Sequence, residues 1–119
     1  MKSFEDLAVW QEGCKIAKEI YQVTGEGDLT KDFGLRNQIR RCAVSVASNI
    51  AEGAGRNSTK EFLHFLGIAN GSSYELQTQL IISTQLKLIS DKSLTPLLQT
   101  IDELQKMNYS LQKKLKSES

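Results

Sequence analysis

The sequence predicts an all-α protein in which residues 1–119 form a single four-helix-bundle domain with up-down-up-down topology. Apolar residues recur at steps of three and four along four segments, and the alternating pattern of a β-strand is absent. The connections between these segments are short, so consecutive helices are expected to lie antiparallel. The third segment is apolar on two faces, which predicts that the chain associates with another chain.

The first helix is expected over residues 6–24. Its apolar residues follow the spacing of one buried helix face; they are Leu7, Trp10, Cys14, Ala17, Ile20 and Tyr21. We interpret Trp10 as an anchor of the core or of an interface, because its large ring can stabilise either. The following stretch, GEGDLTKD, combines two glycines with acidic residues and predicts a loop.

The second helix is expected over residues 35–52. It has one apolar stripe, made of Ile39, Cys42, Val46 and Ile50. Gly53 suits the left-handed residue that often ends a helix, and the stretch GAGRN is predicted to connect this helix to the next.

The third helix is expected over residues 58–89, about 48 Å at 1.5 Å per residue. Ser58 and Glu61 form a capping box, in which each side chain accepts the other residue's amide. The main apolar stripe comprises Phe62, Phe65, Leu66, Ala69, Leu76 and Leu80. A second apolar face comprises Leu63, Ile68, Ile81, Ile82 and Leu86. Because a helix of a lone bundle buries one stripe, the second face predicts burial against another chain.

The fourth helix is expected over residues 94–116, with Pro96 in the first turn, where proline is tolerated. Steps of three and four form a heptad seam of Leu94, Leu97, Ile101, Leu104, Asn108, Leu111 and Leu115. Asn108 is the polar member of this seam, and such a residue fixes the register of packed helices at some loss of stability.

The composition, with 39% apolar and 24% charged residues, is that of a soluble globular protein. No apolar run approaches the ~18 residues of a membrane span, and the N-terminus lacks the apolar core of a secretory signal. Cys14 and Cys42 are too few for a disulfide framework. Reduced thiols and a cytoplasmic location are therefore expected.

The residue types also argue against an enzyme. The chain has one histidine, His64, and no acid or nucleophile is spaced to act with it. Cys14 and Cys42 lie on apolar stripes, where a thiol behaves as a small hydrophobic group. Neither GEG nor GAG continues into a phosphate-binding lysine motif. We expect no catalytic site, no metal site and no cofactor.

The net charge of +1 conceals an uneven distribution of charge along the chain. Residues 1–34 contain four lysines and seven acids, whereas residues 35–60 contain five basic residues and Glu52 alone as an acid. The five are Arg36, Arg40, Arg41, Arg56 and Lys60.

Two interpretations of these basic residues remain open. In the first they form one stripe that binds the nucleic-acid backbone with weak sequence specificity, with Arg36 and Arg40 on the same helix face. In the second they pair with acids of a neighbouring helix, such as Glu12, Glu19 or Glu75. Because no aromatic residue interleaves with the arginines in the sequence, base stacking on this face is not expected.

Five small or polar residues are interpreted as packing residues. Ser45, Asn49 and Glu52 lie one turn apart, and a buried amide and carboxylate select one packing arrangement because they need defined partners. Gly67 and Gly71 each destabilise a helix by about 1 kcal/mol relative to alanine. Close approach of another helix would offset this loss.

Three stretches together resemble the 23S rRNA intervening-sequence protein family, whose members are usually called four helix bundle proteins. They are FEDLAVWQEG, QIRRCAVSVASNIAEGAGRNS and EFLHFLGIANGSSYELQTQL, and the resemblance covers almost the whole chain. The matching positions include Phe4, Leu7, Trp10, residues 38–41, residues 49–53, Gly71, Ser72, Glu75 and Leu76.

The resemblance implies a four-helix protomer that assembles into a ring-shaped homo-oligomer, typically a homopentamer. The chain is also similar to the accessory protein of diversity-generating retroelements, a pentameric barrel that binds a reverse transcriptase and nucleic acid. This similarity implies Arg36, Arg40, Arg41 and Arg56 as candidates for nucleic-acid contact.

The sequence therefore predicts a non-enzymatic, ring-forming accessory factor associated with rRNA or another nucleic acid. Basic patches repeated around a ring would gain avidity without a single strong site. The alternative is a protein-interaction scaffold that binds no nucleic acid and uses its apolar faces for one protein partner.

Overall fold

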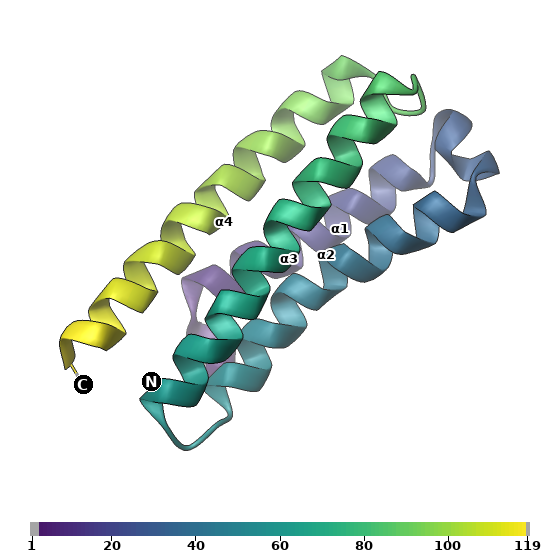
Figure 1. The fold of residues 1–119 in the computed structure, drawn as a ribbon. Coiled ribbons are helices and arrows are strands. Elements are labelled where there is room, and N and C mark those ends of the chain that lie inside the picture. Colours follow the sequence, from purple (N-terminus) through teal and green to yellow (C-terminus); the bar gives the residue numbers. More distant parts are fainter. Residues whose placement is uncertain (1–2, 119) are drawn as a thin grey trace.

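Four helices lie side by side in a bundle of 47 × 20 × 20 Å in the computed structural model, which describes residues 3–118 (Figure 1). They are α1 (Ala8–Thr24), α2 (Phe33–Ala54), α3 (Thr59–Gln85) and α4 (Asp91–Glu118), and the short 3-10 helices η1 (Phe4–Asp6) and η2 (Gly27–Lys31) precede α1 and α2. Successive helices are antiparallel, so α1 begins and α4 ends at the same end of the bundle. The prediction of an all-α four-helix bundle is confirmed, and residues 3–118 contain no strand.

The core runs along the bundle axis and draws on all four helices. Its largest side chains are at most 1% exposed; among them are Ile16, Ile20, Ile39, Val46, Ile50, Leu66, Leu76, Leu80, Ile101 and Leu104. Burying such a side chain contributes about 1.5–3 kcal/mol to stability. Most of these residues belong to the predicted apolar stripes, because helical periodicity places them on one face.

The helix ends differ from the predicted ones where local backbone contacts decide them. Helix α3 ends at Gln85, four residues before the predicted Ile89, and Lys87 then adopts a φ of 62°, which a right-handed helix excludes. Helix α4 begins at Asp91, where the Ser90 hydroxyl accepts the Ser93 amide at 3.1 Å. Pro96 therefore lies in the second turn of α4 and not in the first.

The capping box at the start of α3 is confirmed in its serine half. The Ser58 hydroxyl accepts the Glu61 amide at 3.1 Å, as expected for an N-cap. The Glu61 carboxylate accepts the Ser58 hydroxyl at 3.3 Å rather than the serine amide.

Gly53 lies inside α2, so the expectation that it ends this helix in a left-handed conformation is wrong. The residue is buried, and a Cβ atom there would lie 2.7 Å from the Cβ of Phe65 and 3.1 Å from Cδ1 of Phe62. Glycine is required at this position because α2 and α3 approach too closely for a side chain.

Gly67 and Gly71 have the opposite surroundings. Both are exposed on α3, and a Cβ atom at either would meet no atom within 4 Å. Among residues 3–118, no helix covers them, so the close approach expected from the sequence does not occur within the chain.

No helix in the described part of the chain is both long and apolar enough to span a lipid bilayer.

Candidate nucleic-acid interface

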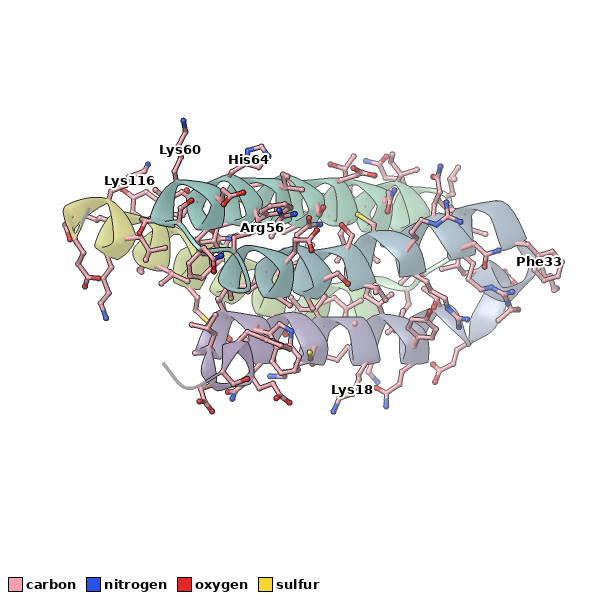
Figure 2. The ribbon with its side chains drawn as sticks, turned by 90° about the horizontal axis from the view of Figure 1, so that it is seen from below. Lys18, Phe33, Arg56, Lys60, His64 and Lys116 are labelled. Atoms are coloured by element: carbon pink, nitrogen blue, oxygen red, sulfur yellow. The ribbon has the colours of Figure 1, made fainter. Side chains whose placement is uncertain are left out.

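The basic residues of segment 35–60 lie at two ends of the bundle. Arg36 and Arg40 belong to the first turns of α2, beside Phe33, whereas Arg56 and Lys60 lie around the α2–α3 connection at the opposite end (Figure 2). About 20 residues separate Arg36 from Arg56, which corresponds to about 30 Å of helix. The expectation of one stripe extended by Arg56 and Lys60 is therefore wrong, because these residues lie far from Arg36 and Arg40.

Arg40 is held against the C-terminal turn of α1. Its Nε donates to the Thr24 hydroxyl at 2.8 Å, and its Nη2 donates to the Tyr21 backbone carbonyl at 3.3 Å. Its guanidinium group also lies over the Tyr21 ring, 4.4 Å from the ring centroid. The positive charge thus sits at a helix C-terminus, where the helix dipole favours it.

Arg36 lies one turn before Arg40, and its guanidinium group is 4.9 Å from the centroid of the Phe33 ring. Its Nε is buried and has no hydrogen-bond partner among the described residues. Aromatic rings therefore lie beside both arginines, although no aromatic residue interleaves with the arginines in the sequence. Tyr21 belongs to α1. Phe33 lies three residues before Arg36, which puts Phe33 and Arg36 on one face of α2.

Arg41 projects toward α3 instead. It is exposed and lines a polar notch of about 290 Å³ between α2 and α3, together with Gln38, Cys42, Ser45, Ser72 and Glu75. Adjacent residues point about 100° apart around an α-helix, so Arg40 and Arg41 face different sides of α2.

The floor of this notch is a set of hydrogen bonds to Ser72. The Cys42 thiol donates to the Ser72 carbonyl at 3.1 Å, and the hydroxyl groups of Ser45 and Ser72 are 2.8 Å apart. Burial, followed by the negative charge of Glu75, raises the pKa of Cys42 to about 11. The thiol is therefore protonated near neutral pH and is a weak nucleophile.

The basic residues differ in whether a carboxylate neutralises them. Within residues 3–118, Arg36, Arg40 and Arg41 form no ion pair, so the predicted alternative of pairing with acids on a neighbouring helix is not found within the chain. Arg56 pairs with Glu52 at 3.5 Å and with Glu61 at 3.8 Å. Its guanidinium group also lies 4.9 Å from the centroid of the Phe65 ring.

Lys60 is exposed on the first turn of α3 and points away from the bundle, as His64 does one turn later (Figure 2). Together with Arg56 it forms a second group of basic residues, whose charge the neighbouring Glu52 and Glu61 offset. Among the described residues, no group of three or more His, Cys, Asp or Glu side chains is placed to hold a metal ion.

Of the polar packing residues in α2, Ser45 and Asn49 are half-buried and Glu52 is exposed. Ser45 links α2 to α3 through Ser72, while the Asn49 amide donates within α2 to the Ser45 carbonyl at 2.8 Å and to its hydroxyl at 3.2 Å. Glu52 has a side chain that is 55% exposed, so the expectation of a buried carboxylate is wrong for the protomer.

Asn108 is fully buried, as its place in the heptad seam predicted. Its Nδ2 donates to the Leu66 carbonyl at 3.0 Å, and its Oδ1 accepts from the amide of Gln112. The side chain thereby connects α4 to the N-terminal third of α3.

The apolar surfaces left open on residues 3–118 include a groove between α1 and α2. The α1–α2 groove, of about 500 Å³, is lined by Phe4, Trp10, Cys14, Ala17, Lys18, Val44, Ala47, Ser48 and Ala51. Trp10 lies half-buried in it and packs edge-on against Phe4, with ring centroids 5.2 Å apart. The sequence analysis missed Val44, Ala47 and Ala51 because they fall outside the single stripe assigned to the second helix.

Another open apolar surface is the α3 outer face, made of Gly67, Ile68, Gly71, Ile82 and Leu86. Ile68 is 39% exposed, Ile82 44% and Leu86 60%. The glycines leave space along this face, since a Cβ atom would meet nothing there. Part of the second apolar face predicted for the third helix is therefore open to a partner.

The comparisons with known proteins give one family and one fold. The family model of the 23S rRNA-intervening sequence protein matches residues 5–110. Among curated proteins, no sequence matches this chain. Among solved structures, the chain resembles a protein with unknown function from the S23 ribosomal protein family of Bacteroides thetaiotaomicron, with a TM-score of 0.81 and 23% identity over 89% of this chain and 99% of that chain. At this level of identity, the likeness shows the fold alone.

Proposed function

Because this chain belongs to the 23S rRNA-intervening sequence protein family, we propose that it is a non-enzymatic accessory factor that binds the backbone of rRNA or another nucleic acid. It acts as a ring of identical four-helix protomers. Each protomer contributes the arginines of α2 that no carboxylate among residues 3–118 neutralises, and the symmetry of the ring multiplies these weak sites into an avid surface.

The observation that carries the proposal is that Arg36, Arg40 and Arg41 have no carboxylate partner among residues 3–118. A guanidinium group presents several N–H donors in a fixed plane that matches a phosphate group. Arginines that no carboxylate neutralises keep a net positive charge for an external anion, and neutralised phosphates release counterions.

The ring forms by contact between two different surfaces. The α3 outer face of one protomer packs on the α1–α2 groove of the next, so the space beside Gly67 and Gly71 receives the wall of the groove. Contacts between unlike surfaces are heterologous and close into rings when the rotation fits. The sequence resemblance gives five as the expected number of protomers.

The non-enzymatic role is consistent with the chemistry of the thiols. Cys14 and Cys42 are both free, and burial raises the pKa of each. We place the protein in the cytoplasm, where such thiols remain reduced.

The test is a titration of a structured rRNA fragment and of duplex DNA across salt concentrations. Replacing both Arg36 and Arg41 by glutamine lowers the slope of log K against log salt by about one for each phosphate that is no longer neutralised. The double variant Lys15→Gln with Lys92→Gln removes the same charge from other surfaces and leaves the slope unchanged. Absence of binding at low salt, or equal effects of the two double variants, contradicts the proposal.

The second candidate function is a protein scaffold, and the α1–α2 groove favours it. The groove is lined mainly by apolar side chains, including the Trp10 ring, and can receive an apolar helix of another protein. The similarity to the retroelement accessory protein suggests a reverse transcriptase as that partner. A protomer that stays monomeric and binds no nucleic acid supports this alternative, because its groove is then free for another protein.

A further inference from the structure

The start of α2 carries a surface that phosphate binding alone does not explain. This arginine–aromatic surface consists of Tyr21, Phe33, Arg36 and Arg40. The Phe33 ring is 63% exposed and the Tyr21 ring 48%, and each lies beside a guanidinium group. We propose that this surface binds unpaired nucleotides by stacking, so that single-stranded nucleic acid is the preferred ligand. The inference rests on the proposed function and names its substrate class.

The stacking groups are arranged in order along one face. Phe33, Arg36 and Arg40 follow each other at steps of three and four, and Tyr21 of α1 lies against Arg40. A base can stack on an aromatic ring or on a guanidinium plane, and neither contact depends on the identity of the base. The surface thus offers several planar groups next to positive charge.

The guanidinium groups are positioned before any ligand arrives. Arg40 is fixed by its bonds to Thr24 and Tyr21, and Arg36 lies against the Phe33 ring. A side chain that is already ordered loses less conformational entropy on binding.

Nearby acids do not neutralise these arginines. The Asp32 carboxylate accepts the Leu35 amide at 3.1 Å and caps α2, and Asp28 pairs with Lys31 at 3.8 Å. Neither carboxylate forms an ion pair with Arg36 or Arg40 in the described chain. The remaining N–H donors are therefore available for a phosphate beside the stacked base.

The surface discriminates against a duplex. The bases of a duplex are paired and stacked on each other, so they offer a protein their edges and phosphates but not their faces. An unpaired strand offers both a base face to Phe33 and a phosphate to the arginines. Single strands therefore gain a contact that duplexes lack.

The experiment measures binding of labelled oligouridine RNA of about 12 nucleotides, within the range of known single-strand sites, by fluorescence anisotropy. A mixed-sequence RNA duplex of the same length is measured in parallel. Phe33→Leu keeps an apolar side chain but removes the π face, and weakens single-strand binding about fivefold or more. Its duplex binding and its salt slope stay unchanged.

Two further variants make the result specific. Tyr109→Leu removes another exposed ring, 69% exposed on α4, and leaves single-strand binding unchanged. Phe33→Trp enlarges the ring and keeps or strengthens binding. Circular dichroism spectra confirm that all variants fold.

The outcomes separate this inference from the proposed function. Equal affinity for the single strand and the duplex, with no effect of Phe33→Leu, overturns the stacking surface and leaves backbone binding in place. An equal loss in Tyr109→Leu also overturns it. Failure of both ligands to bind overturns this inference together with the proposed function.

Discussion

Neighbouring arginines of α2 have different structural roles. Arg40 is tied to α1 by two hydrogen bonds and a ring contact, whereas Arg41 is exposed beside the α2–α3 notch. Arg40 thus contributes to the joint between α1 and α2 as well as to the surface. Because a substitution there removes both roles at once, Arg36 and Arg41 are the residues to replace when binding is measured.

Arg40→Ala is expected to lower the free energy of unfolding by about 1–2 kcal/mol, because it leaves the buried Thr24 hydroxyl without its donor. Urea denaturation followed by circular dichroism measures the change. Arg41→Ala is the matched control and is expected to unfold as the wild type does. Equal stabilities of the two variants would show that the contacts of Arg40 contribute nothing.

The carboxyl group of Glu12 predicts a pH dependence of stability. Burial, followed by the neighbouring carboxyl of Glu103, raises the pKa of Glu12 above its ordinary value of 4.5. The folded state therefore binds this proton more tightly than the unfolded state does. The stabilisation that comes from protonated Glu12 is complete below the ordinary pKa of 4.5. It is lost as the pH rises through the raised pKa of the folded state.

Glu12→Gln is expected to remove this loss, so the variant is more stable than the wild type at pH 7 and similar to it at pH 4. Thermal melts at a series of pH values measure the difference. Glu26→Gln, in the exposed α1–α2 connection, serves as the control. A constant difference between Glu12→Gln and the wild type at all pH values would rule out the titration of Glu12 as the cause.

Among the helix pairs of the bundle, α2 and α3 approach each other closely at Gly53. Gly53 removes the side chain where the two helices meet, and Ser45 and Ser72 join them by a hydrogen bond nearer the middle. In this hydrogen bond each hydroxyl group has a partner. It therefore favours one packing of α2 on α3 without leaving a buried donor unpaired.

Gly53→Ala is expected to destabilise the protein by about 1–3 kcal/mol, because the added methyl group overlaps Phe65. The cost of the steric overlap thus outweighs the gain of about 1 kcal/mol in helix propensity that alanine has over glycine. Gly34→Ala in the same helix is the control, since its Cβ atom would lie 3.8 Å from the Asp32 carboxylate, an ordinary contact. Thermal denaturation measures the stability of both variants. A Gly53→Ala variant as stable as Gly34→Ala would contradict the close approach of α2 and α3.

At the scale of the whole molecule, apolar surface remains on two sides of a narrow bundle. The α3 outer face and the α1–α2 groove belong to different helices, so one protomer can use both at the same time. This arrangement suits a ring, in which every protomer gives one surface and receives the other.

Light scattering at micromolar concentration is expected to give a multiple of the protomer mass of 13.3 kDa. Gly71→Leu is expected to return the protein to monomers while keeping its helical content, because leucine fits the open space of the protomer but blocks a partner. Ser110→Leu, exposed on α4, is the control and leaves the assembly intact. A wild-type protein that runs as a monomer contradicts the ring.

Features that depend on local spacing could be predicted from the sequence. Four helices follow from apolar periodicity, the start of α3 from Ser58, and the buried position of Asn108 from its heptad seam. These features depend on residues a few positions apart, which the helix brings to one face wherever it packs.

Contacts between side chains of different helices could not be predicted in this way. The tertiary structure placed the Tyr21 ring on Arg40, left Glu52 exposed and put Gly53 inside the α2–α3 contact. These relations depend on how each helix is rotated and how far it slides along its neighbour. Packing of the whole core fixes that rotation and register, so the pattern of one helix does not contain them.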